Sequence, residues 1–228
     1  MATRHTLATI AQTQTLTNKT LTSPVLQGDV DGWVGANETW TYASATTITV
    51  PSGAASTYQK GDKIKLTQTT VKYFYITAVA DTVLTVTGGT DYTVADAAIS
   101  LNYYSKVENP QGFPAYFNYT PTWSSDGGAF TNDPTVTYAR FKIEGGYCQV
   151  EAYATYNATS GGDGRTIMSL PITPSQIWTA GQGMNIPNNI STLVVGAYET
   201  GNSYFQKYDG ATNIANSAPF GIGITYAF

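Results

Sequence analysis

The chain has 228 residues, of which 42% are hydrophobic and only 11% are charged, with a formal net charge of −4. In a typical soluble domain about a quarter of the residues are charged. In this chain the polarity comes instead from Thr, Ser, Asn, Gly and 17 Tyr. The acidic balance and the lack of a basic cluster argue against nucleic-acid binding, which needs cations to neutralise phosphates. No apolar run reaches the roughly 18 residues of a membrane-spanning helix, so we expect no membrane insertion.

Residues 15–26, TLTNKTLTSPVL, contain a near-repeat with few large apolar side chains. Leu16 and Leu21 are five residues apart and do not share a helix face, and β-branched Thr disfavours helix. Pro24 pushes the residue before it toward an extended conformation. Such an extended stretch becomes stable when several copies wind together with their leucines at a common axis. The expected anchor positions are Leu16, Leu21, Val25 and Leu26; a loose N-terminal arm is the alternative.

Residues 29–106 are dense in strand and turn signals. Within them, the run 60–66, KGDKIKL, alternates aliphatic residues with Lys63 and Lys65. Because side chains alternate between the two faces of a strand, we expect both lysines in water and the aliphatic residues inside. Several short strands with turns at close spacing predict a small β-barrel or sandwich module.

Residues 115–228 predict a second β module. The runs 135–143 and 147–156 alternate apolar and polar residues and are separated by Gly145-Gly146, a strong hairpin signal. Further short strands bring the expected number to about eight. Between the modules, residues 107–114 contain two prolines and a glycine and are expected to form a short, ordered elbow.

The residues that most often perform catalysis are scarce. The single cysteine, Cys148, lies in a strand pattern and is expected to be a buried small hydrophobe. The single histidine, His5, would have to reach a distant domain to complete a catalytic triad, and no His/Cys metal set is possible. DVDG at 29–32 supplies Asp29 and Asp31 but lacks the third acidic position and the spaced Glu of a full calcium loop, so an ordinary Asp-Gly turn is favoured. We therefore predict no catalytic residue, metal or cofactor.

Three parts of the chain resemble bacteriophage tail-fibre and minor virion structural proteins. They are TLTNKTLTSP near the start; GWVGANETWTYAS, YQKGDKIKLTQTTVKYFYI, VTGGTDYTVADAAI and YYSKVENPQGFP between Asp31 and Pro114; and YTPTW, RFKIEGGYCQVEAYATY and SLPI beyond. The resemblance implies an all-β protein with four parts. These are an N-terminal arm and oligomerising stalk (1–28), a small β module (29–106), an elbow linker (107–114) and a jelly-roll-like C-terminal β-sandwich head (115–228).

The function implied by this resemblance is that of a virion structural protein, built as a homotrimeric fibre or spike. It would be assembled in the host cytoplasm, dock on other tail or capsid proteins through residues 1–28 and mediate adhesion to a host-surface glycan. A capsid head-fibre or decoration protein with a structural role is the close alternative. A polysaccharide hydrolase needs only two carboxylates, but most Asp residues of the head sit beside Gly or Asn, where they form turns.

Glycan recognition combines flat aromatic faces with Asn, Asp and Gln hydrogen bonds. The segment 198–208, YETGNSYFQKY, concentrates such groups around an expected turn. The candidate glycan-binding residues are Trp123, Trp178, Tyr198, Asn202, Tyr204 and Tyr208. At each tyrosine the alternative is sheet packing or a subunit contact.

Overall fold

The computed structural model describes residues 31–125, 130, 132–157, 165–176, 179–185, 191–198, 201–207 and 219–228. Their regular structure consists of antiparallel β-strands and one short helix, α1 (Ala54–Thr57). The all-β class predicted from the sequence is therefore confirmed. Within these ranges, no helix has the length and apolar character required to span a bilayer. The predicted anchors lie outside the described residues: Leu16, Leu21, Val25 and Leu26.

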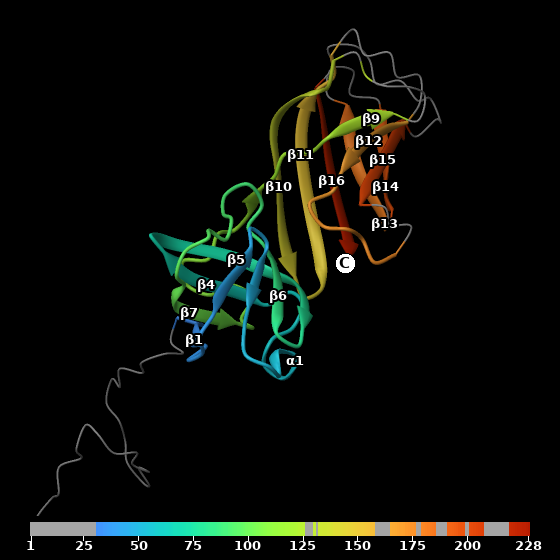
Figure 1. Cartoon of the computed structure of the whole chain (residues 1–228). Helices are drawn as coiled ribbons and strands as arrows, with labels where there is room; N and C mark the ends of the chain where they lie inside the picture. Colours follow the sequence, from blue (N-terminus) through green and yellow to red (C-terminus); the bar gives the residue numbers. More distant parts are fainter. Residues whose placement is uncertain are drawn as a thin grey trace, which may run out of the picture.

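The first sheet has seven strands and corresponds to the N-terminal β module (Figure 1). In spatial order they are β1 (Val34–Gly35), β7 (Ser100–Ser105), β4 (Lys63–Gln68), β5 (Thr70–Ala80), β6 (Val83–Thr87), β3 (Thr47–Thr49) and β2 (Thr41–Ser44). Alternate residues of β4 and β5, among them Ile64, Leu66, Phe74 and Ile76, are fully buried in one core with Trp40. The alternation of strand side chains thus produces the apolar face that the sequence predicted.

The second sheet has nine strands and contains the C-terminal part of the chain. In spatial order they are β8 (Phe117–Asn118), β10 (Thr135–Glu144), β11 (Tyr147–Thr155), β16 (Pro219–Ala227), β13 (Thr179–Asn185), β14 (Ser191–Tyr198), β15 (Asn202–Lys207), β12 (Thr166–Ser169) and β9 (Trp123–Ser125). The ring of Trp123, on the strand at one end of this order, packs edge-on against Phe220 of the inner strand β16. The sheet therefore folds over its own core. A jelly-roll-like arrangement of this part stays a prediction.

The hairpin of β10 and β11 is the most regular part of the second sheet. Its turn is Gly145-Gly146, with φ of 56° and 113°, which is left-handed backbone that favours glycine. Cys148 on β11 is completely buried, and its apolar surroundings raise the pKa of the thiol to about 12. Both the hairpin and the buried cysteine agree with the predictions from sequence. In Figure 1, β10, β11 and β16 run side by side as long strands.

An aromatic junction joins the two sheets. Tyr75 lies on the opposite face of β5 from the first core and packs edge-on against Phe113 at 5.0 Å and Phe117 at 5.4 Å between ring centroids. The segment between the modules is tied back to the first one, because Trp33 Nε1 donates a hydrogen bond to the carbonyl of Gln111 at 2.8 Å. Tyr75 of the first sheet therefore belongs to the same buried cluster as Phe117 of the second sheet.

A backbone contact reinforces this junction. The amide of Thr90 donates to the carbonyl of Asn118 at 2.7 Å. Asp91 accepts from the Asn118 amide and from its side-chain Nδ2, at 2.8 and 2.9 Å. Gly89 lies so close that an added Cβ would sit 2.0 Å from the Asn118 carbonyl oxygen. Only a residue without a side chain permits this approach.

The prediction that Lys63 lies in water is wrong. Lys63 is only 5% exposed, because its face of the first sheet is covered by the junction instead of by solvent. Its ammonium group lies 5.6 Å from the ring centroid of Tyr75 and 5.9 Å from that of Phe113. Burial lowers the pKa of Lys63 from its ordinary value. Lys65, two residues further on, is half-buried and lies 4.7 Å from the Trp33 ring centroid.

Candidate functional site

Three of the predicted glycan-binding residues lie on the neighbouring strands β14 and β15. Tyr198 and Asn202 are paired backbone positions of β14 and β15, and Tyr204 lies two residues further along β15. Ser203 between them is completely buried, so Asn202 and Tyr204 project from the other face of the strand. The Arg165 guanidinium lies 4.9 Å from the Tyr204 ring centroid.

Trp123 is not part of this group. Trp123 lies on β9 directly opposite Met168, which is fully buried, and its ring packs edge-on against Phe220 at 5.8 Å. Its indole thus contributes to the core of the second sheet. Trp178 and Tyr208 lie outside the described residues. A glycan site built from the six residues together stays a prediction.

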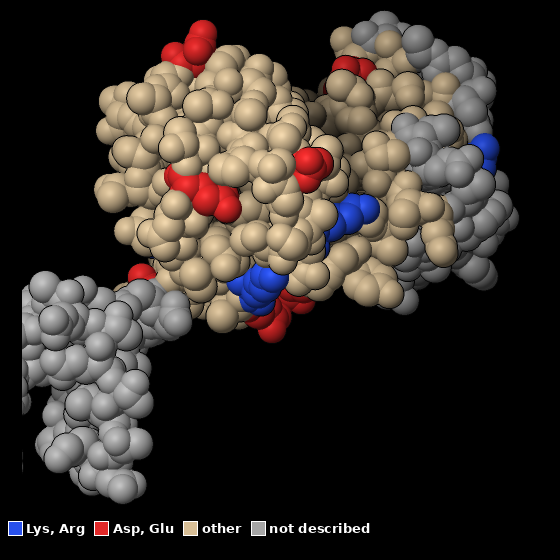
Figure 2. All heavy atoms as spheres, turned by 60° about the horizontal axis from the view of Figure 1, so that its bottom comes forward, with Lys and Arg blue, Asp and Glu red and all other residues tan. Residues whose placement is uncertain are grey.

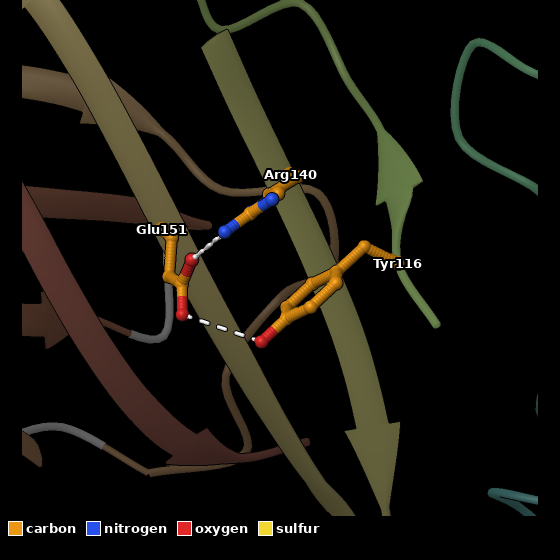
Figure 3. A network of polar contacts seen from close by, with 3 residues as sticks. All are labelled: Tyr116, Arg140 and Glu151. Carbon is orange, nitrogen blue, oxygen red and sulfur yellow. Dashed lines mark hydrogen bonds and ion pairs between the residues drawn. The ribbon is translucent and has the colours of Figure 1, made fainter. Parts of the chain in front are cut away.

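A second group of polar and aromatic residues, which the sequence analysis did not single out, lies on the outer face of β10 and β11. At its centre Glu151 accepts hydrogen bonds from Nε and Nη2 of Arg140, at 3.0 and 2.8 Å. The hydroxyl of Tyr116 lies 3.4 Å from the other oxygen of the same carboxylate. Figure 3 shows the three side chains converging between the hairpin and the segment before β8.

Aromatic rings surround this charge pair. The Arg140 guanidinium carbon lies 4.3 Å from the ring centroid of Tyr116 and 5.2 Å from that of Tyr138. Tyr138 stacks on Tyr153 with 5.9 Å between centroids and 19° between planes. Tyr138 is 43% exposed, so one edge of the stack reaches solvent. We call the set Tyr116, Tyr138, Arg140, Glu151 and Tyr153 the tyrosine face.

The tyrosine face follows from the register of the hairpin. Because Glu144 pairs with Tyr147 across the two-glycine turn, counting back places Arg140 opposite Glu151 and Tyr138 opposite Tyr153. Directly opposite residues on one sheet face have Cβ atoms about 5 Å apart, close enough for an ion pair or a ring stack. Counting from Gly145-Gly146 could therefore have identified both pairs from the sequence.

The charges of this region cancel in pairs. Arg140 is bound to Glu151 and Lys142 to Glu144, and the hydrogen bonds that these two basic side chains donate to the carboxylates raise their pKa. On the face of the molecule that Figure 2 shows, Lys, Arg, Asp and Glu cover only a small part of the described surface. A face of this kind fits an uncharged ligand better than a strongly charged one.

The two carboxylates of the hairpin are poorly placed for hydrolysis. Arg140 lies opposite Glu151, and Glu144 lies four residues after Arg140 on β10. Four residues correspond to about 13 Å along a strand. Paired glycosidase carboxylates lie about 5 to 9.5 Å apart. Each carboxylate is also bound to a basic side chain. In the part of the chain that the structure describes, no three His, Cys, Asp or Glu side chains gather as metal ligands would.

Glycines border the tyrosine face on β16. Gly221 pairs with Tyr153 and Gly223 with Glu151. A ring carbon of Tyr153 lies 3.7 Å from the position of a Cβ on Gly221, so this ring covers the glycine backbone. Gly223 is exposed and leaves backbone accessible beside Glu151. The face therefore offers aromatic edges, polar groups and open backbone side by side.

Comparison with known proteins does not identify this arrangement. No known family model matches the chain, and neither a curated protein nor a solved structure shows significant similarity to it.

Proposed function

We propose that the chain is a bacteriophage virion structural protein, a homotrimeric fibre or spike that adheres to a host-surface glycan. The observation that carries the proposal is the tyrosine face. It joins partly exposed rings to hydrogen-bonding groups on a charge-poor surface. Rings of this kind pack on the apolar faces of sugars, and neighbouring polar groups bind the hydroxyls. No cofactor and no catalytic step are part of the proposal.

Preorganisation supports a binding role. Arg140 is held by two hydrogen bonds to Glu151 and by the rings of Tyr116 and Tyr138. Tyr138 is held by Tyr153. Side chains that are already ordered lose little conformational entropy when a ligand binds, so more of the contact energy appears as affinity.

Attachment to the particle is assigned to residues 1–28 by the sequence resemblance and by the sparse leucines of this segment. In this proposal Leu16, Leu21, Val25 and Leu26 line the axis of a trimer, which displays three copies of the head at the virion surface. Light scattering of the full chain should give the mass of a trimer. A Leu16→Ser/Leu21→Ser variant should give the monomer mass, and a wild-type monomer would contradict the stalk.

The glycan proposal is tested on an array of bacterial surface polysaccharides with the full chain and a Tyr138→Ala/Tyr153→Ala variant. We expect selective binding by the wild type and at least tenfold weaker binding by the variant, since each ring contributes about 1 kcal/mol or more. Tyr103→Ala removes a half-buried tyrosine from the first sheet and serves as the matched control. Equal binding by all three proteins, or none to any polysaccharide, would exclude the tyrosine face as the receptor site.

A capsid head-fibre or decoration protein is the second candidate, and the junction between the sheets favours it. Direct backbone contacts at Asn118 and a shared aromatic core suit a stiff structural element. The tyrosine face would then contact another virion protein, since Tyr and Arg are enriched in protein interfaces. Binding of the full chain to assembled capsids, lost with Tyr138→Ala/Tyr153→Ala, would favour this role over glycan adhesion.

A further inference from the structure

A cleft of about 430 Å³ lies where the first sheet meets the end of the second. One wall comes from β5, β6 and the turns beside them, and the other from residues 171–173 and Phe228. The volume is within the range of small-molecule sites, and such sites often occur where two domains meet. The tyrosine face contributes no residue to it.

The walls of the cleft are rich in hydroxyl groups. Five threonines line it: Thr46, Thr77, Thr85, Thr87 and Thr173. Thr77 donates to the carbonyl of Thr85, and Thr87 accepts from the amide of Gly89. In the described ranges, no hydrogen bond engages the hydroxyls of Thr46, Thr85 or Thr173. Three hydroxyl groups on two walls are thus available to a ligand.

One cation lies at this cleft. The ammonium group of Lys60 lies 4.7 Å from the ring centroid of Phe228, which positions the lysine by a cation–π contact. Lys60 takes part in no ion pair among the described residues, and no Asp or Glu belongs to the described lining. The cleft therefore combines the ammonium group of Lys60 with hydroxyl donors and acceptors.

We propose that this cleft binds a saccharide unit that carries a carboxylate or a phosphate. Lys60 binds the anionic group, the threonine hydroxyls bind the sugar hydroxyls, and Pro171 and Ile172 cover the apolar edge of the ring. The inference goes beyond adhesion at the tyrosine face, because the cleft is a separate site and its ligand is charged. A soluble monosaccharide suffices to occupy it, so either site can fail while the other holds.

Isothermal titration of the full chain with four probes tests the inference: glucuronic acid, glucose 6-phosphate, glucose and inorganic phosphate. We expect one acidic sugar per chain to bind at least tenfold more tightly than glucose, because hydrogen bonds to charged groups contribute more than neutral ones. Glucose 6-phosphate should bind more tightly than inorganic phosphate. Equal affinity for glucose and the acidic sugars, or for phosphate and glucose 6-phosphate, would overturn the proposal, as would no binding of either acidic sugar.

Two variants and a control tie the binding to the cleft. Lys60→Gln should lower the affinity for the acidic sugars about tenfold to a hundredfold and leave the affinity for glucose unchanged. Thr85→Val should lower the affinity for every sugar probe. Lys106→Gln removes the same charge from another exposed lysine outside the lining and should bind like the wild type. If Lys60→Gln behaves like Lys106→Gln, or Thr85→Val like the wild type, the assignment is refuted; equal thermal midpoints verify that the variants are folded.

Discussion

Replacing Gly89 with alanine should break the backbone contact between the two sheets. An added Cβ would lie 2.0 Å from the carbonyl oxygen of Asn118, far inside any allowed contact. The backbone fixes the position of a Cβ, and the carbonyl oxygen of Asn118 is itself a backbone atom, so a rotamer change cannot relieve the clash. Gly89 also has a φ of +60°, a conformation that an alanine adopts only with strain.

The cost follows from the interactions that must be given up. The left-handed backbone contributes about 1–2 kcal/mol for any residue with a Cβ. Moving Asn118 away removes its bond from Thr90, about 1 kcal/mol, and weakens its two bonds to Asp91, about 1–2 kcal/mol after allowance for their exposure. We therefore expect the free energy of unfolding to fall by about 3–5 kcal/mol.

Gly145 provides the matched control. Its φ is +56°, almost the same as that of Gly89, but an added Cβ there meets no atom within 4 Å. Gly145→Ala should therefore lower the free energy of unfolding only by the cost of the backbone strain, about 1–2 kcal/mol. The difference between the two variants in urea unfolding isolates the contact with Asn118.

Hydrogen exchange gives a local measurement of the same effect. The amides of Thr90 and Asn118, which donate across the contact, should exchange faster in Gly89→Ala and remain protected in Gly145→Ala. Equal losses of stability in the two variants, with unchanged protection of both amides, would refute the reasoning that this contact holds the sheets together.

Three further predictions concern single side chains. Cys148 ionises in the unfolded chain near pH 8.5 but in the folded protein only near pH 12, so stability present below about pH 8.5 is lost as pH rises toward 12; urea midpoints that stay constant between pH 8 and pH 11 would contradict this. Phe117→Ala empties a fully buried site between the sheets and should lower the free energy of unfolding by about 3–5 kcal/mol, measured by urea unfolding. Glu151→Gln should leave the urea midpoint nearly unchanged, because exposed ion pairs contribute little; a large shift would show that the pair stabilises the fold.

The local elements were predictable because they depend on neighbouring residues. The hairpin of β10 and β11 is specified by its alternation and by Gly145-Gly146, and the same turn fixes the pairing of Arg140 with Glu151. Counting register would have given the centre of the tyrosine face. The Tyr116 side chain would still have been missed, since it comes from outside the hairpin and its position depends on β8 packing beside β10.

The junction was not predictable from local pattern. Alternation assigns Lys63 to the outer face of its strand correctly, but it cannot reveal that another part of the chain covers this face. Gly89 and Asn118 approach each other closely, but no pattern in the sequence around either residue indicates this contact. The position of β16 between β11 and β13 likewise depends on pairing between distant segments, which composition and period do not encode.

The stiffness of the junction has a consequence for multivalent attachment. The backbone contact at Asn118 holds the second sheet against the first. The tyrosine face therefore has a fixed orientation relative to Asp31, where the described chain begins. In the proposed trimer, the three tyrosine faces would be held at fixed angles around a common axis. Receptors whose spacing matches those angles would engage all three arms and gain avidity, whereas other spacings would engage a single arm. Selectivity would then depend on receptor spacing as well as on sugar chemistry.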